Sequence, residues 1–462
     1  MVQQTDLVSI RESHSWLRAV CLSVSISMCI AVDILQYSFP LSFLPRSLED
    51  EGHSSKHIAA VIGGYYWSGF VGGMFITAWQ IFKIFFRKAS PLTMSHVRWQ
   101  IAALIVGLLV GAVTLIKQAH DASYLVHMVC RVIQGFLGAI LFFYSYLLSI
   151  ELFTGKQQIF ALTLNTIALN VAEVGGPLFG ATVFTVSGQA TSFYFLTGMS
   201  VVNQIMLLGA LWYLSHLQPP SSPADDFESS LLISSDEQIQ PSQAASGYER
   251  FTDIISNPYL WKSLVVIAPS ALVKSEIENI LPLFADHSLG FDTMSIGFSF
   301  SAVAFAFVAS SVAIGLSWDA LPERIRDLVV GSSLVLLSIF STTILPLTQI
   351  SHNPTVFTAL LAVYGIFLGL TITPSSFLLG EFVDSLKDSQ SKDVANGLWN
   401  TVWEFGGSLG FFVSGIPRSN DWKNEGLVIS LSSLTLIFAA VGFFWSIQTI
   451  KRDRFALMIK TD

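Results

Sequence analysis

Five charged side chains interrupt stretches of the sequence that are otherwise apolar: Asp33, Arg131, Glu173, Glu278 and Glu404. Each stretch is long enough to cross a bilayer as a helix. A charge at the bilayer centre costs roughly 2.5–3.5 kcal/mol on insertion scales, so such residues usually have a partner or line a polar path. Together they predict a route through a membrane for protons or charged molecules.

Asp33 lies in the middle of the first apolar stretch. Desolvation disfavours the charged form of a carboxylate, so this side chain can bind a proton or a cation near neutral pH. We expect it to bind a substrate ammonium or to couple transport to protons. The alternative is a structural polar contact to another helix.

Arg131 begins a motif that contains Gln134, Gly135 and Gly138. Glycines at this spacing allow a neighbouring helix to approach closely. We interpret Arg131 as the fixed positive charge of a transporter core, with Gln134 one turn away on the same helix.

Glu173 directly precedes a glycine–proline turn. Pro177 cannot donate a backbone hydrogen bond and kinks a helix, while Gly176 and Gly180 form a face of small residues. This combination predicts a rigid, close contact between two helices. Glu173 itself can pair with Arg131 or carry a proton, and both interpretations stay open.

Two further segments combine acids with cations or aromatic rings. Lys274 and Glu278 are four residues apart, so they share a helix face and can pair, whereas Glu276 points elsewhere. The alternative there is a salt bridge at a water-exposed helix end.

Glu404 follows Trp399, Asn400 and Trp403, and an acid beside aromatic faces suits an organic cation. The alternative is an aromatic stripe facing lipid, with Glu404 paired across the bundle.

Composition identifies the class of protein. The 462 residues are 52% hydrophobic and only 12% charged, whereas soluble domains carry about 25% charged residues. The sequence therefore predicts an all-α, multi-pass membrane protein. The net charge of −8 lies mostly in one internal loop, and basic residues do not gather with aromatics, so we expect no nucleic-acid partner.

The sequence shows no pattern of an enzyme or a metal site. Cys21, Cys29 and Cys130 all lie in apolar stretches and are expected to be small core residues. His-rich clusters, nucleophile elbows and phosphate-binding loops are not found. We therefore expect no catalysis, no cofactor and no bound metal.

Twelve apolar segments have spanning length. They cover residues 17–42, 60–82, 99–119, 124–148, 158–185, 192–215, 259–284, 294–316, 328–348, 355–380, 394–416 and 427–448. The expected domains are a cytoplasmic N-terminus (1–16), a six-helix bundle (17–215), a disordered cytoplasmic linker (216–256), a second six-helix bundle (257–450) and a cytoplasmic C-terminus (451–462). Most of the 24 Lys and Arg residues fall on one side if both termini are cytoplasmic, which favours that orientation.

The linker is rich in Ser, Pro, Gln and acids, a composition typical of disorder. It contains Glu228-Ser229-Ser230-Leu231-Leu232-Ile233, which matches an acidic dileucine pattern. We expect a possible sorting adaptor to bind there. Such a signal favours a vesicular or vacuolar membrane, with the plasma membrane as the alternative, and we expect a monomer in the lipid bilayer.

Six spans, a polar linker and six more spans resemble the major facilitator superfamily. The motif from Arg131 to Ala139 is similar to that family's fourth-span motif, and Gly175-Gly176-Pro177-Leu178-Phe179-Gly180 is similar to the fifth-span motif of its proton antiporters. Its cytoplasmic gate motif resembles a group of four residues here: Gly315, Asp319, Arg324 and Arg326. The corresponding loop after the second span differs, because Gly73 is followed by Thr77 and no acid. The resemblance implies two six-helix bundles and transport by alternating access.

A second resemblance is to the vesicular amine and polyamine transporters. It rests on Glu278-Asn279-Ile280-Leu281-Pro282, on Pro374-Ser375-Ser376 with Asp384, on Gly397-Leu398-Trp399, and on Asp33 at the position of a first-span acid. The monoamine members carry a further acid where this chain has Asn400. The resemblance implies an amine-like cargo without naming it.

The leading hypothesis is proton-coupled antiport of an organic cation, with protons and a small molecule as partners. The cargo would bind near the midplane, between the two bundles. One alternative is a carrier of a neutral or anionic metabolite held by Arg131. Another is a non-transporting receptor or scaffold, which the missing acid after Gly73 makes conceivable.

Overall fold

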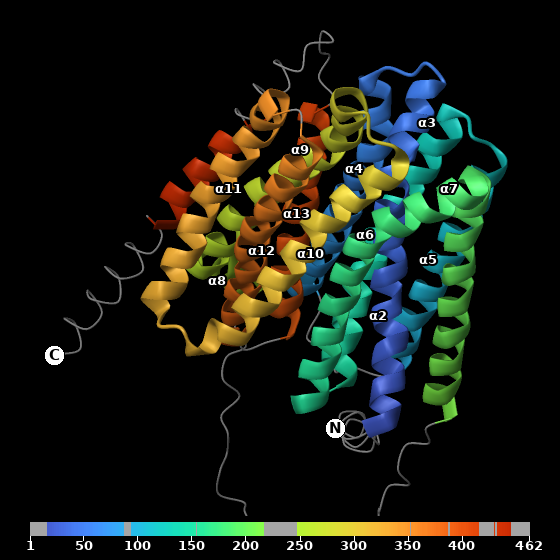
Figure 1. Ribbon diagram of the computed structural model, residues 1–462. Helices are drawn as coiled ribbons and strands as arrows, with labels where there is room; N and C mark the ends of the chain where they lie inside the picture. Colours follow the sequence, from blue (N-terminus) through green and yellow to red (C-terminus); the bar gives the residue numbers. More distant parts are fainter. Residues whose placement is uncertain are drawn as a thin grey trace, which may run out of the picture.

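The computed structural model describes residues 16–86, 94–153, 155–216, 247–351, 353–386, 389–414, 429 and 432–444. Every element assigned in these ranges is a helix (Figure 1). The first half contains α2 (Trp16–Ser38), η1 (Phe39–Ser42), α3 (Leu44–Asp50), α4 (Ser55–Phe86), α5 (Met94–His120), α6 (Tyr124–Leu152) and α7 (Gly155–His216). After it come α8 (Gly247–Ser256), α9 (Pro258–Leu289), α10 (Thr293–Ser317), η2 (Trp318–Ala320), α11 (Glu323–Ser351), α12 (Pro354–Ser385) and α13 (Ser389–Ser414). The all-α prediction is confirmed.

The long helices run back and forth between two faces of the molecule (Figure 1). We call the face at which α2 begins the near face, and the face at which α2 ends the far face. The run α7 contains two predicted spans, joined near the far face at Gly188, whose φ of 80° breaks the helix. Glycine adopts this left-handed conformation without steric cost, so the chain can reverse there in a tight turn.

Eight helical segments among the described residues are long and apolar enough to cross a membrane. Neither α9 nor α13 is one of them, although both run from face to face. The charged residues of α9, which include Lys262, Lys274 and Glu278, lower its hydropathy. A further apolar helix, Ser432–Phe444, lies in the predicted twelfth span.

The predicted disordered linker (216–256) is wrong for its last ten residues, which form α8. Ile254 on this helix is fully buried and packs with Ile84, at the near-face end of α4, and with Leu260 of α9. Arg250 also donates a hydrogen bond to the carbonyl of Ile84 at 3.1 Å. Apolar side chains at helical spacing explain why this segment orders, while the dileucine pattern at 228–233 lies outside the described residues.

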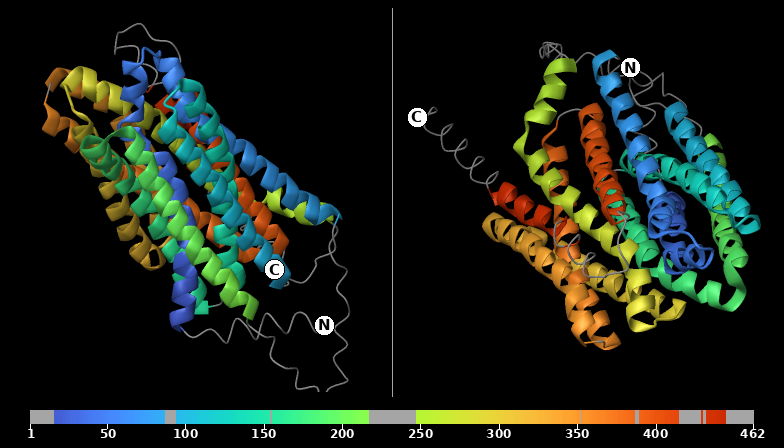
Figure 2. Two further views of the ribbon diagram at one scale, coloured as in Figure 1. Left: turned by 90° about the vertical axis from the view of Figure 1, so that its right-hand side faces the viewer. Right: turned by 90° about the horizontal axis from the view of Figure 1, so that it is seen from above.

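The helices form two halves that lie side by side (Figure 2). On one flank α4 packs along α13, and on the other α7 packs against α10. One continuous core of buried side chains crosses between the halves, and Phe39 and Phe43 of the first half share it with Phe284 and Phe300 of the second. The interface between the halves therefore contains the elements that carry the charged residues.

Candidate functional site

A cluster of ions lies where the two halves meet. The Nζ of Lys274, on α9, lies 2.5 Å from Oε1 of Glu173, on α7, and 2.7 Å from Oε1 of Glu278. The hydroxyl of Tyr37, on α2, donates a hydrogen bond to Oε2 of Glu278. Two contacts, Glu173–Lys274 and Tyr37–Glu278, thus join the halves through polar groups. We call Glu173, Lys274, Glu278 and Tyr37 the central cluster.

Two prolines shape the backbone on either side of the central cluster. Glu173 lies four residues before Pro177, and Glu278 lies four residues before Pro282. In a helix the carbonyl of a residue accepts the N–H four positions later, and proline has none. The carbonyls of both glutamates therefore lack that helical donor.

Aromatic rings surround the Lys274 ammonium. Its Nζ lies 5.7 Å from the ring centroid of Trp403, on α13, and 5.9 Å from that of Tyr37. Tyr66, on α4, contacts Tyr37 edge-on, with ring centroids 5.0 Å apart. Carboxylates combined with aromatic faces are the usual environment for a bound organic cation.

A small cavity adjoins the central cluster. It is lined by Glu173, Lys274 and Glu278 together with the apolar side chains of α10 and α12, and its volume is about 30 Å³. That space holds one or two water molecules. The hydroxyl of Tyr364, on α12, lines the same cavity, is buried, and has no hydrogen-bond partner among the described residues.

Asp33 faces the interior of the first half and is 4% exposed. Its Oδ1 accepts a hydrogen bond of 2.6 Å from the hydroxyl of Tyr65, on α4. A Cβ added to Gly138, on α6, would lie only 2.5 Å from that oxygen, so the glycine makes room for the carboxylate. Tyr65 and Tyr37 have ring centroids 5.3 Å apart, which connects Asp33 to the central cluster.

Glu404, on α13, lies at the crossing of α13 with α4. Its Oε2 is buried and has no hydrogen-bond partner among the described residues, and it faces Gly69 closely enough to exclude a Cβ there. The rings of Trp399 and Trp403 stack with centroids 6.4 Å apart, and Trp403 belongs to the wall of the central cluster. Asn400 is buried on the same helix, one turn before Glu404.

Arg131, on α6, is also buried, but it does not pair with Glu173. Its Nη1 donates to the carbonyl of Gln36, on α2, at 2.5 Å. Four residues after Gln36 stands Pro40, which cannot donate the helical hydrogen bond to that carbonyl. The carbonyl of Gln36 therefore lacks a helical donor at the end of α2, and Arg131 supplies a donor from within the first half.

Gln134 belongs to a separate polar chain of the first half. Its Nε2 donates to Oγ1 of Thr114 at 3.0 Å and to Oε1 of Gln118 at 2.9 Å, both on α5. Gln118 in turn contacts His127 at 3.1 Å. The structure therefore places Gln134 among α5–α6 contacts and away from the central cluster.

The predicted close contact of α7 is made with the end of α2 and with η1. A Cβ added to Gly176 would lie 1.9 Å from Oγ of Ser38, and one added to Gly180 would lie 2.0 Å from the carbonyl oxygen of Phe39. Only glycine allows backbones to approach this closely. Pro177, between them, lines the small cavity beside the central cluster.

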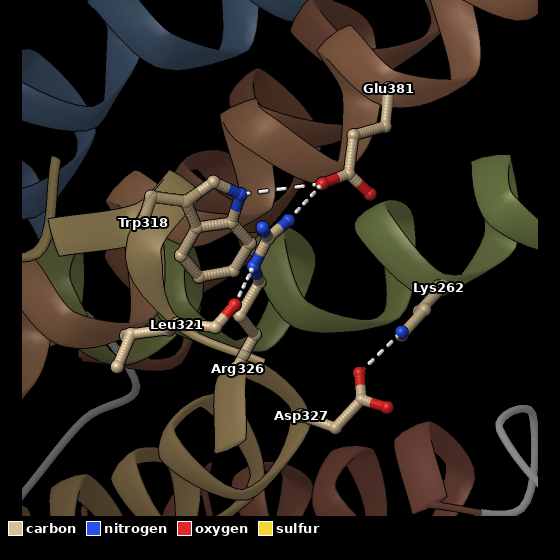
Figure 3. A network of polar contacts seen from close by, with 6 residues as sticks. All are labelled: Lys262, Trp318, Leu321, Arg326, Asp327 and Glu381. Carbon is tan, nitrogen blue, oxygen red and sulfur yellow. Dashed lines mark hydrogen bonds and ion pairs between the residues drawn. The ribbon is translucent and has the colours of Figure 1, made fainter. Parts of the chain in front are cut away.

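Of the predicted gate residues, Arg326 belongs to a network of polar contacts in the second half (Figure 3). Arg326, on α11, donates to Oε1 of Glu381, on α12, at 3.0 Å and lies over the ring of Trp318 at 5.2 Å. Its Nε also donates to the carbonyl of Leu321 at 2.9 Å. Gly315 lies in the last turn of α10, Asp319 lies in η2, and Arg324 is exposed. The contacts of Arg326 join helices within one half.

Behind this network, Lys262 of α9 and Asp327 of α11 form a second buried ion pair, with Nζ and Oδ1 2.5 Å apart (Figure 3). Both side chains belong to the second half. This pair differs from the central cluster, whose ion pair of Glu173 and Lys274 crosses the interface.

Polar contacts also join the halves at the far face. Arg46, on α3, forms an ion pair with Asp286 of α9 at 3.4 Å, and His287 lies 3.2 Å from Glu49. Carboxylate and imidazole atoms of Glu49, Asp286 and His287 lie within 4.8 Å of one another, but these two contacts already account for the grouping. The far-face pairs hold the two halves together at this end.

A larger cavity of about 980 Å³ opens between α4, α6 and α13. Its walls are almost entirely apolar, with Lys56 as the charged residue and Phe411 at its inner side. Without a carboxylate it does not offer a site for a cation.

Sequence reasoning missed the tyrosines that hold the acids. Tyr37 donates to Glu278, Tyr65 donates to Asp33, and Tyr364 lines the small cavity. Tyr37 follows Asp33 by four residues, so the two share a helix face. That spacing could have indicated that Tyr37 belongs to the same polar site as Asp33. Pairing across the halves had no signal in a single sequence.

Comparison with known proteins gives a consistent picture. The family described as the Major Facilitator Superfamily matches residues 26–411. A bacterial homolog to human lysosomal transporter, Spinster, in an inward-facing and unoccupied conformation is similar over 95% of this chain and 99% of its own, with a TM-score of 0.66 and 11% identity. The inward-facing and occupied conformation gives a TM-score of 0.64 and 12% identity over 96% and 99% of the two chains. No curated protein sequence matches the chain.

Proposed function

The chain belongs to the Major Facilitator Superfamily, and on that premise we propose that it is a secondary active transporter that exchanges an organic cation for protons by alternating access. The cargo binds at the central cluster, between the two halves, and Asp33 takes part from the interior of the first half. The chain is similar in fold to a transporter captured in inward-facing conformations, which supports a cycle in which the two halves rock around this site.

One observation carries the proposal: carboxylates that are buried or half-buried outnumber the cations in and around the central cluster. Lys274 is shared by Glu173 and Glu278, so it neutralises one of the two carboxylates. Asp33 has a hydroxyl partner, and one oxygen of Glu404 has no partner among the described residues. The excess negative charge of these carboxylates is neutralised only after the site binds a proton or a cation.

Competition between these two ligands couples their movement. A protonated carboxyl does not attract an ammonium, and an ammonium bound to the carboxylate keeps the proton away. Asp33 and Glu278 are the acids that we propose to exchange ligands, with Glu173 and Glu404 as further proton carriers. An unpaired ionised carboxylate is costly inside the membrane. The site therefore changes its access from one side of the membrane to the other only when it holds a proton or the cargo.

An anionic cargo held by Arg131 has less support. The Nη1 of this arginine is bonded to the carbonyl of Gln36 within the first half. Arg131 does not line the small cavity beside the central cluster. Its contact suits a residue that fixes α6 against α2.

We also propose the arrangement in the membrane. The excess of Lys and Arg at the near face favours a cytoplasmic near face and cytoplasmic termini, with bundles over 17–215 and 257–450. The membrane would be vesicular or vacuolar if the dileucine pattern at 228–233 is read by an adaptor.

Uptake of a panel of amines into acid-loaded proteoliposomes tests the proposed function. We expect uptake that collapses with the pH gradient and that Glu278→Gln abolishes. The control variant Asp253→Asn removes an exposed acid of α8 and should behave as the unmodified protein. Uptake that ignores the pH gradient would contradict proton exchange.

A further inference from the structure

The ammonium site of the central cluster is already occupied by an ammonium. Lys274 lies 2.5 Å from Glu173 and 2.7 Å from Glu278, with the rings of Trp403 and Tyr37 beside it. These are the groups that an organic cation would need. The remaining cavity of about 30 Å³ is too small for anything but water.

We propose that Lys274 is a tethered stand-in for the cargo ammonium, which the cargo displaces when it binds. This inference rests on the proposed function and adds to it the class of ligand and the way in which binding unlocks the halves. The ligand is a primary alkylammonium with an apolar body. Its ammonium replaces Nζ of Lys274, and its body lies toward Phe300, Phe307 and Leu368, which line the cavity and must move apart to admit it.

One observation beyond the ion pairs indicates a ligand. Tyr364 lines the cavity, and its hydroxyl is buried and has no partner in the parts of the chain that the structure describes. An alkylammonium has three N–H donors, so it can donate one to each of the two carboxylates and one to this hydroxyl.

Displacement of Lys274 has a structural consequence. The pair of Lys274 with Glu173 connects α9 of the second half to α7 of the first. A cargo ammonium that takes over Glu173 and Glu278 releases α9 from this pair. Cargo binding thereby opens a polar link between the halves.

The proposal predicts that removing the competitor strengthens binding of the cargo ammonium. A tethered group acts at a high effective concentration, so its loss should lower the half-saturating concentration of a free alkylammonium. We expect a change of roughly tenfold, within the range usual for coupled sites. If the ion pair is purely structural, the alkylammonium does not displace Lys274, and the unfolding temperature of the unmodified protein does not respond to it.

Chemical complementation of Lys274→Ala in the full-length protein tests this directly. The deleted atoms correspond to n-propylammonium, so thermal unfolding of the purified protein is followed during titration with n-propylamine and with n-propanol. We expect K274A to unfold at a lower temperature than the unmodified protein, and the amine alone to raise that temperature. The half-saturating concentration should be about tenfold lower than for the unmodified protein.

Two further variants control the experiment. K274M fills the space of the lysine stem and should respond less to the amine than K274A. K274A/E278Q removes one acceptor and should lose most of the response. Equal responses to amine and alcohol, or equal half-saturation in K274A and the unmodified protein, would overturn the stand-in role. If K274A is too unstable to isolate, the yield of folded protein made with amine or with alcohol replaces the titration: a yield raised by the amine alone supports the proposal, and equal yields contradict it.

This result is separable from the proposed function. Amine binding by K274A without amine transport by the unmodified protein would leave the site chemistry standing and remove the transport proposal. Amine transport by the unmodified protein, combined with no gain in binding for K274A, would remove the stand-in role alone.

Discussion

At the scale of single residues, two of the acids each accept a hydrogen bond from a tyrosine. Tyr65 donates to Asp33, and Tyr37 donates to Glu278. The two tyrosine rings contact each other across the space between the acids. A change at one acid therefore reaches the other through aromatic contacts, and substitutions at either should affect both cargo and proton binding.

The first prediction concerns Asp33. In Asp33→Asn the side chain keeps its size but cannot bind a proton, so the pH dependence of amine uptake should flatten and gradient-driven uptake should fall by roughly tenfold or more, the rate equivalent of 1.4 kcal/mol. Uptake measured at acidic and neutral internal pH gives the comparison. Tyr65→Phe, which retains the carboxylate, should keep a pH dependence. A variant D33N with unchanged pH dependence would exclude Asp33 as the coupling residue.

The second prediction concerns Arg131 and Pro40. Arg131→Met leaves the carbonyl of Gln36 without a donor, a loss that typically costs about 1–3 kcal/mol. Pro40→Ala restores a backbone N–H four residues after Gln36, so it should recover stability in the R131M background although it does not stabilise the unmodified protein. Thermal unfolding of the single and double variants measures this coupling. Strictly additive effects would show that Arg131 does not serve that carbonyl.

At the scale of elements, α7 depends on two glycines that touch backbone. In Gly180→Ala the new methyl group would lie 2.0 Å from the carbonyl oxygen of Phe39, so η1 or α7 must move and we expect a lower unfolding temperature and loss of transport. Gly198→Ala, on the same element, meets no atom within 4 Å. It should be neutral or stabilise the protein by up to about 1 kcal/mol. Similar effects of the two variants would contradict the predicted tight contact.

The start of α10 provides a prediction about pH. Asp292 caps this helix and accepts a 2.9 Å hydrogen bond from the backbone N–H of Ser295, which lowers the pKa of its carboxyl. Because the pKa is lower in the folded state, the stabilisation exists above the carboxyl's unfolded pKa and disappears as the pH falls through the folded pKa. Asp292→Ala should therefore cost about 1 kcal/mol near neutral pH and much less in acid. Unfolding temperatures of both proteins across this range test it, and a constant difference would contradict the cap.

Some elements could be predicted from the sequence and others could not. Apolar length predicted long helices, and eight described segments are long and apolar enough to cross a membrane. The i, i+4 spacing predicted the contact of Lys274 with Glu278. The order of α8 was missed because a polar, Ser-rich composition outweighed the apolar positions of a ten-residue helix. The partner of Glu173 was also missed, because Lys274 lies on the other half of the molecule and long-range contacts leave no local pattern.

At the scale of the whole molecule, the far-face pairs define one state of the cycle. Arg46 and Asp286 join the halves at that face, so alternating access requires them to separate. In a Cys21→Ser background, Arg46→Cys and Asp286→Cys joined by a short bifunctional thiol reagent should stop transport, and reduction of a cleavable linker should restore it. His120 and Tyr194 also contact each other at 3.0 Å, but both belong to the first half. The same cross-link at those positions should leave transport intact, and an active 46–286 cross-link would exclude rocking about this interface.

The most direct test of the account is the exchange itself. Proteoliposomes with an acidic interior and an internal pH indicator are given an external amine, and the response of protein-free vesicles is subtracted. The account predicts that the amine drives protons out, that the internal pH rises with saturable dependence on the amine, and that D33N and E278Q remove this rise. Amine entry with no proton movement beyond that of empty vesicles would contradict the claim that one buried set of carboxylates serves both ligands.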